Sequence, residues 1–201
     1  MRILSQLIGL IAHPLLIPAF GAFFYFQVTP KYSPPDLQRA NILPIFILTA
    51  IIPLISMIIL QNLGLIRSAQ MKNPDERVYP LLVGLVLLLM VLLQVIPNNY
   101  TPELYFYILG LTIAVAACLL LALTRKIVSL HMVGMGSLLA FMVALSIHFE
   151  KNIVVAISLC TLACGLVAMA RLYLKIHGRA GVFTGLLIGL VSQLLLIRFW
   201  V

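Results

Sequence analysis

The residues best suited to chemistry gather in one short stretch near the end of the chain. Arg171, Lys175, His177 and Arg179 fall within nine residues, between two long apolar segments. Arginine and lysine attract anions, and a histidine beside them can act as a nucleophile or exchange a proton near neutral pH. The same charges at the end of a membrane helix can also be interfacial anchors, so the cluster alone supports both interpretations.

Two earlier stretches carry residues of the same kind. Ser129 and His131 stand where an apolar segment begins, and a serine, a histidine and backbone amides at a helix N-terminus would form an anion site. Ser129 could instead be only a helix cap. Lys72 and Arg77 lie in the amphipathic stretch 63–80, whose charges could contribute to the same site or pair with one another in a solvated loop.

The composition indicates that membrane helices position these groups. Of the 201 residues, 63% are hydrophobic and only 9% are charged, against roughly 25% charged in soluble domains. A helix needs about 20 mostly apolar residues to cross a bilayer. We therefore expect an all-α, polytopic transmembrane helical bundle in a single domain, 1–201, with about seven membrane segments, or six if the first is re-entrant. The predicted segments are 3–28, 42–60, 78–96, 104–123, 128–147, 153–169 and 182–197.

The first predicted segment, 3–28, contains an ionisable group deep in the membrane. At about 1.5 Å per residue, His13 lies near the bilayer midplane, and Pro14 and Pro18 should kink the helix around it. A histidine at this depth should face the interior of the bundle, either satisfied by a backbone carbonyl freed at the kink or lining a substrate cavity. The segment is too long for a signal peptide and lacks a small-residue cleavage site, so we expect it to be a helix.

Other small or potentially reactive residues are assigned to helix packing. Cys118, Cys160 and Cys164 all lie inside apolar segments, which favours packing over a metal or redox site. Gly185 and Gly189, four residues apart, are expected to let two helices approach closely. The stretch 29–41 is expected to be an exposed loop that carries no site, and 97–102 is expected to be a turn between two helices. His148 and the tight turn 149–152 are expected to lie at the surface.

The order of the segments brings the polar stretches to one face of the membrane. Two helices separate Arg77 from Ser129, and two more separate His131 from Arg171, so each pair of helices crosses and returns. This topology puts nine of the thirteen basic residues on that face. The positive-inside rule then predicts that the face is cytoplasmic, in what we expect to be a bacterial inner membrane.

The spacing around His177 resembles that of a known family. Arg171, five residues, His177 and a following Val-Phe-Thr-Gly185 are similar to the third signature of the type 2 phosphatidic-acid phosphatase superfamily, Ser-Arg-x5-His-x3-Asp. Ala170 replaces the serine of the signature, and Gly181 replaces its aspartate.

The two earlier stretches resemble the other signatures of the superfamily. Ser129 and His131 are in register with the second signature, Pro-Ser-Gly-His, although its proline and glycine are replaced. Lys72 and Arg77 are spaced Lys-x4-Arg and resemble the first signature, Lys-x6-Arg-Pro, more weakly. The resemblance covers 72–185, somewhat over half of the chain.

The resemblance implies hydrolysis of a lipid phosphate or lipid diphosphate through a phosphohistidine, without a metal or another cofactor. His177 would attack phosphorus, His131 would protonate the leaving group, and Arg171 would stabilise the charge of the transition state. The implied substrate is a phospholipid or an isoprenoid phosphate that enters from the lipid bilayer, and nucleic acid is not an expected partner. Substrate binding would fall to Lys72, Arg77 and Ser129.

The replacement of the aspartate by Gly181 leaves two functions open. In the family this carboxylate orients the nucleophilic histidine, as in a serine-protease triad, where its loss costs about 10⁴-fold in rate. Asp75 or Glu76 could take its place, because both belong to the same face of the membrane. Otherwise the chain is a catalytically inactive descendant that binds or translocates an anionic lipid with the same cations.

Overall fold

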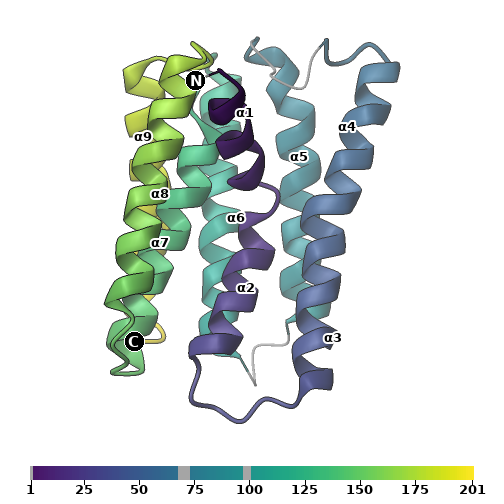
Figure 1. The fold of residues 1–201 in the computed structure, drawn as a ribbon. Coiled ribbons are helices and arrows are strands. Elements are labelled where there is room, and N and C mark those ends of the chain that lie inside the picture. The colour runs from purple at the N-terminus through teal and green to yellow at the C-terminus, as the bar shows by residue number, and fades with distance from the viewer. Residues whose placement is uncertain (1, 68–72, 97–100) are drawn as a thin grey trace.

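The architecture is a bundle of long helices packed side by side (Figure 1). The computed structural model describes residues 2–67, 73–96 and 101–201, and in these ranges every regular element is helical. Within these ranges six helical stretches are long and apolar enough to cross a membrane, which confirms the predicted polytopic helical bundle. Residues 97–100 of the predicted turn lie outside the described ranges. The helices are α1 (Arg2–Ile11), α2 (Ile17–Val28), α3 (Pro35–Phe46), α4 (Ile52–Asn62), α5 (Asp75–Met90), α6 (Pro102–Leu123), α7 (Leu130–His148), α8 (Val154–Tyr173) and α9 (Arg179–Ile197).

The first predicted membrane segment is two helices rather than one kinked helix. α1 and α2 follow one another from the N-terminal end of the bundle to the opposite end (Figure 1). Between them the chain breaks at residues 12–16, where His13 N donates to Leu10 O at 3.3 Å in place of a regular helical bond. Pro14 causes the break, because it has no N–H for Leu10 O and its ring clashes with that carbonyl. Since the two helices together run the length of the bundle, a re-entrant first segment is not supported.

Proline also shapes the second segment, which is longer than the hydropathy predicts. α3 starts at Pro35, inside the stretch 29–41, where the sequence predicts an exposed loop. Proline suits the first turn of a helix, because an amide there has no helical partner to lose. A π-helical turn, Ile47–Ile51, joins α3 to α4. The irregularity falls between Pro44, inside α3, and Pro53, in the first turn of α4.

α7 is the most buried of the long helices and packs closely on α9. Gly185 and Gly189 of α9 face it, and a Cβ at position 185 would lie only 2.6 Å from Ser129 O. This close approach confirms the packing role predicted for the two glycines. Cys160 and Cys164 of α8 are buried as well. Within the described ranges, no group of three His, Cys, Asp or Glu side chains is placed to hold a metal ion.

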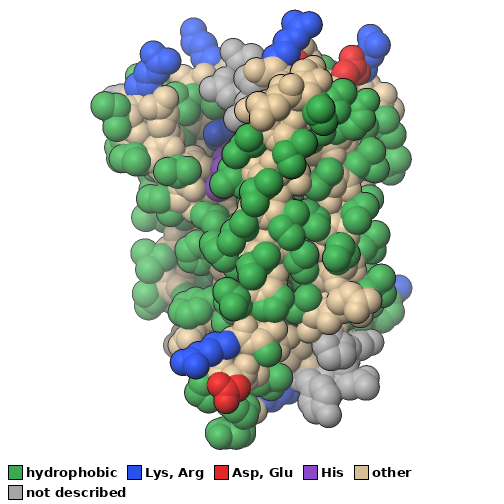
Figure 2. All heavy atoms as spheres, turned by 90° about the vertical axis from the view of Figure 1, so that its right-hand side faces the viewer, with side chains coloured by type: hydrophobic (Ala, Val, Ile, Leu, Met, Phe, Trp, Pro, Cys, Tyr) green, Lys and Arg blue, Asp and Glu red, His purple; other side chains and the backbone are tan. Residues whose placement is uncertain are grey.

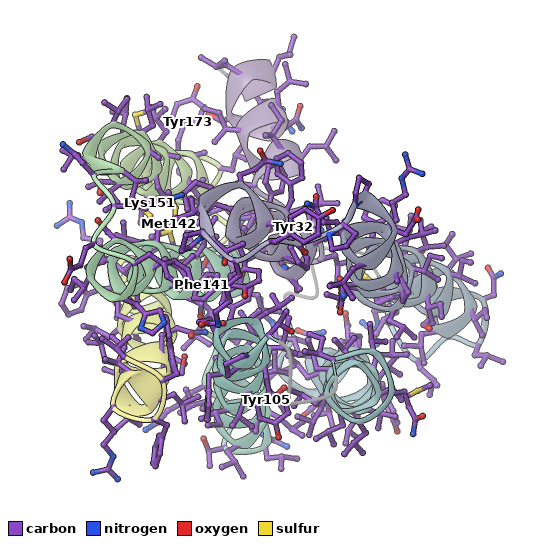
Figure 3. The ribbon with its side chains drawn as sticks, turned by 90° about the horizontal axis from the view of Figure 1, so that it is seen from below. Tyr32, Tyr105, Phe141, Met142, Lys151 and Tyr173 are labelled. Atoms are coloured by element: carbon purple, nitrogen blue, oxygen red, sulfur yellow. The ribbon has the colours of Figure 1, made fainter. Side chains whose placement is uncertain are left out.

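α2 lies between α3 on one side and α7 on the other when the bundle is viewed along its axis (Figure 3). Tyr107 of α6 donates from its hydroxyl to Ile17 O, the first residue of α2, at 2.9 Å. The Tyr107 ring stacks on Phe141 of α7 with 4.2 Å between centroids, and both side chains are fully buried. These contacts anchor the start of α2, and with it the break that follows α1, to the core.

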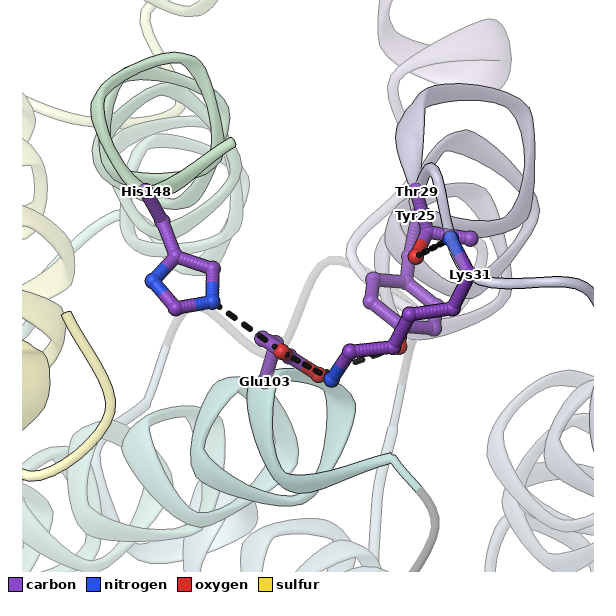
Figure 4. A network of polar contacts seen from close by, with 5 residues as sticks. All are labelled: Tyr25, Thr29, Lys31, Glu103 and His148. Carbon is purple, nitrogen blue, oxygen red and sulfur yellow. Dashed lines mark hydrogen bonds and ion pairs between the residues drawn. The ribbon is translucent and has the colours of Figure 1, made fainter. Parts of the chain in front are cut away.

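A polar cluster closes the end of the bundle opposite the N-terminus (Figure 4). Glu103, whose side chain is 2% exposed, accepts hydrogen bonds from Tyr25 Oη at 3.0 Å and His148 Nε2 at 3.2 Å. Lys31 Nζ lies 2.5 Å from the same carboxylate. His148 is therefore not the exposed turn residue that the sequence predicts. The cluster ties α2 and the segment after it to α6 and α7.

Candidate anion-binding site

Arg77 lies inside the bundle and not in a solvated loop. α5 begins at Asp75, so Arg77 occupies the first turn of a helix, and only 5% of it is exposed. Its Nη1 donates to Val128 O at 2.7 Å, and its Nη2 lies 3.1 Å from His177 Nε2. These contacts join the three polar stretches at one end of the bundle, which confirms that they share a face.

The two carboxylates beside Arg77 turn away from the site. Successive residues of a helix point about 100° apart, so a helix that directs Arg77 inward directs its neighbours elsewhere. Asp75 is exposed, and Glu76 accepts from Asn73 Nδ2 at 2.9 Å. Within the described part of the chain, neither carboxylate is hydrogen-bonded or ion-paired to His177. The expectation that one of them replaces the missing aspartate is wrong.

His131 and Arg171 meet at the end of α1. His131, in the first turn of α7, has its Nε2 3.0 Å from Gly9 O, and its ring lies edge-on to His13 with 5.4 Å between centroids. Arg171, in the last turn of α8, packs on the same glycine, because a Cβ at position 9 would lie 3.2 Å from its Nη1. Arg171 Nε makes no hydrogen bond with any described residue. A helix outside the three polar stretches thus contributes to the site.

A cavity of about 730 Å³ opens between these groups. Arg77, His131, Arg171 and His177 line it, and its described lining residues include no aspartate or glutamate. Apolar residues of α4 and α5, Leu87 among them, form another wall. Figure 2 shows basic and histidine side chains in a hollow near one end of a largely hydrophobic face. The cavity therefore suits an anionic group attached to a hydrocarbon chain.

Of the other two predicted site residues, Ser129 is not on the cavity wall, and the position of the second is not described. Ser129 has no exposed surface, and its backbone N donates to Gly181 O at 3.0 Å. Ser129 is the N-cap residue of α7, but its Oγ makes no capping bond and no other hydrogen bond with a described residue. Ser129 lies in the contact between α7 and α9, where its backbone meets Gly181 and Gly185. Lys72 lies outside the described residues.

The environment of His177 favours a neutral imidazole with an electron pair on Nε2. Arginine only donates hydrogen bonds, so the contact with Arg77 requires Nε2 to accept. Burial, and then the charges of Arg77 and Arg171, lower the pKa of His177 from 6.5 to about 4, while the carbonyl of Val128 opposes the shift. The proton of the neutral ring is therefore on Nδ1, which has no hydrogen-bond acceptor among the described residues.

Gly181 accounts for the missing acceptor. A Cβ at this position would lie 2.9 Å from Ile127 O and 3.9 Å from Cδ2 of His177. The position thus lies beside His177, and the backbone before α7 occupies the space that a side chain at position 181 would need. Gly181, Gly185 and Gly189 recur every four residues and form one stripe of close contact along α9. An aspartate here would require the two backbone segments to move apart.

The sequence interpretation missed the contribution of α1. Arg2, Gln6, Gly9 and His13 recur every three or four residues, which places them on one helix face, and all four line the cavity. Arg2, Gln6 and Gly9 lie on α1 and His13 follows in the break, and this spacing of polar and small residues in an apolar segment is the signal that could have revealed the contribution of α1. Of the two roles left open for His13, cavity lining is the one observed, and its Nδ1 accepts from Leu15 N at 3.4 Å.

Comparison with known proteins identifies no family. No protein-family model, curated protein or solved structure matches the chain. The resemblance to phosphatidic-acid phosphatases therefore rests on the residues quoted above, and function has to be argued from the geometry of the cavity.

Proposed function

We propose that the cavity binds the phosphate group of a membrane lipid and that His177 accepts the phosphoryl group. The 3.1 Å contact between Arg77 Nη2 and His177 Nε2 carries this proposal. It brings together the electron pair of a neutral imidazole and a guanidinium group, which are a nucleophile and a phosphate ligand. Arg171 adds a second guanidinium group to the same cavity.

In the proposed reaction, His177 Nε2 attacks phosphorus, and the bond from phosphorus to the bridging oxygen of the lipid breaks. His131, with both ring nitrogens protonated, donates its Nδ1 proton to that oxygen and becomes neutral, and the lipid alcohol or lipid monophosphate leaves. Water then attacks the phosphohistidine while His131 takes back a proton, and inorganic phosphate is released. Arg77 and Arg171 balance the charge on the non-bridging oxygens in both steps.

The apolar wall of the cavity supports a lipid as the substrate, either a phospholipid or an isoprenoid phosphate that reaches the site from the bilayer. We place the site at the cytoplasmic face of a bacterial inner membrane, because the topology assigns nine of the thirteen basic residues to that end. The basic residues assigned to the other end are Lys31, Arg39, Lys151 and Arg198.

One observation favours a second function, in which an anionic lipid is bound or translocated without turnover. His177 Nδ1 has no acceptor among the described residues, and Gly181 supplies none. In a serine-protease triad, the carboxylate in this role contributes about 10⁴-fold to the rate. Arg77 and Arg171 would bind phosphate equally well with or without catalysis.

Phosphate release from lipid phosphates by the purified protein in detergent tests the proposal. The panel contains phosphatidic acid, its lyso form and an isoprenoid diphosphate, each assayed with a chelator present. We expect metal-independent release that is lost in His177→Ala and strongly reduced in His131→Ala. His148→Gln is the matched control, since it changes a histidine at the opposite end of the bundle.

Two results distinguish the candidates. Release that is equal in the wild type and His177→Ala would contradict a role for His177 in catalysis. Absence of release, together with lipid-phosphate binding that requires Arg171, would establish binding without turnover instead.

A further inference from the structure

The carbonyl oxygen of Gly9 is available to the site because α1 ends early. In an uninterrupted helix, Gly9 O would accept from the amide of residue 13. Here His13 N donates to Leu10 O at 3.3 Å, since Pro14 has no N–H to offer that oxygen. Carbonyls at the C-terminal end of a helix need partners from elsewhere, and Gly9 O has one in His131.

This contact determines which nitrogen of His131 carries a proton. A carbonyl oxygen only accepts hydrogen bonds, so Nε2, which lies 3.0 Å from Gly9 O, is protonated. In the neutral ring Nδ1 is then the nitrogen left to exchange a proton with a bound group. The histidine of a catalytic triad is oriented in the same way: a fixed hydrogen-bond partner holds one ring nitrogen, and the other nitrogen exchanges a proton.

We propose that the broken end of α1 is a positioning element for His131, and that Pro14 creates it by freeing Gly9 O. Gly9 has a second effect in the same place, because its lack of a side chain lets Arg171 Nη1 approach. α1 packs on α8 and lies outside the stretches that resemble phosphatase signatures. The general-acid role of His131 rests on the proposed function, whereas its tautomer does not.

NMR of the full-length protein labelled with ¹⁵N-histidine, in detergent, tests the proposal without requiring turnover. His131→Asn assigns the signal. In the wild type we expect His131 in the Nε2–H tautomer with a hydrogen-bonded proton. In Pro14→Ala, position 14 regains an N–H, the helix can continue and recapture Gly9 O, and His131 should lose this signature. Pro44→Ala changes a proline inside α3 and is the matched control that should retain it.

An Nδ1–H tautomer in the wild type, or an unchanged Nε2–H signal in folded Pro14→Ala, would overturn the proposal. If Pro14→Ala does not fold, the tautomer of His131 in the wild type alone tests the proposal: Nε2–H supports it and Nδ1–H contradicts it. Where phosphate release is measurable, Pro14→Ala should lower kcat about a hundredfold with a smaller effect on KM, because the proton donor is misplaced. If neither the wild type nor the variant releases phosphate but His131 has the Nε2–H tautomer, the proposed phosphatase activity is rejected. The proposal that α1 positions His131 then still stands.

Discussion

Burial and positive charge act on His177 in the same direction. They hold its pKa at about 4, so the ring is neutral at pH 7 and its Nε2 can act as a nucleophile. In the unfolded chain a histidine binds its proton near pH 6.5. Between the two values the unfolded state binds more protons than the folded state, so the free energy of unfolding rises with pH across this window.

We predict that part of this pH dependence belongs to His177. In His177→Asn, acidification from pH 6.5 to about pH 4 should reduce stability less than in the wild type, because the group that binds a proton on unfolding is gone. Thermal unfolding in detergent at a series of pH values measures the difference. Equal losses in both proteins would show that His177 is not held neutral by its surroundings.

A second prediction concerns the geometry of Arg77. Arg77→Lys keeps the positive charge but removes the fork that contacts Val128 O and His177 Nε2 together. Binding of a lipid phosphate should weaken by about tenfold, the equivalent of one lost hydrogen bond. Isothermal titration with a short-chain lipid phosphate measures this, with the exposed Arg67→Lys as control. Unchanged affinity would mean that only the net charge of Arg77 matters.

At the scale of helices, the close contact along the glycine stripe of α9 leaves no room for a side chain at position 181. Gly181→Ala should lower the free energy of unfolding by about 1–3 kcal/mol, the cost of overpacking, because its Cβ would lie 2.9 Å from Ile127 O. Gly165→Ala in α8 is the control, since its Cβ would meet no atom within 4 Å apart from those of its chain neighbours and the adjacent backbone of its own helix, and higher helix propensity should raise stability by up to about 1 kcal/mol. Thermal unfolding that ranks the two variants equally would contradict the close contact between α9 and the start of α7.

Hydropathy predicts the membrane helices well and their polar ends poorly. Apolar runs identify the cores of α6 to α9, but α5 extends back to Asp75 and so makes Arg77 a buried helix residue. Two partners of Arg77, Val128 and His177, are 51 and 100 residues away in sequence, so no local pattern could have shown these contacts inside the bundle. The break after α1 follows from Pro14 by local physics, but the use of the freed Gly9 carbonyl depends on α7.

At the scale of the whole molecule, the two ends of the bundle have different roles. Counting helices between polar stretches correctly predicts that Arg77, His131 and His177 meet at one end. The other end is held by Glu103, a residue that the apolar pattern of α6 conceals and that sequence reasoning missed.

We predict that Glu103 can be changed without loss of phosphate binding. Glu103→Gln should cost about 2 kcal/mol of stability, because the buried hydrogen bonds to a charged acceptor weaken. Affinity for lipid phosphate should stay within twofold, roughly, of the wild-type value, because the cavity lies at the opposite end. The exposed Glu150→Gln is the control, and a melting temperature for Glu103→Gln equal to that of the wild type would contradict the role of the cluster.

The central claim is that this cavity recognises the phosphate group of a lipid, and thermal stabilisation by ligand tests it most directly. Phosphatidic acid should stabilise the wild type with the logarithm of its concentration above Kd, by about 2.7 kcal/mol at a hundred times Kd, whereas diacylglycerol, which lacks the phosphate, should not. Arg171→Gln should abolish the effect, and Arg198→Gln at the other end should preserve it. Equal stabilisation by the two lipids, or stabilisation by phosphatidic acid that survives Arg171→Gln, would contradict the account.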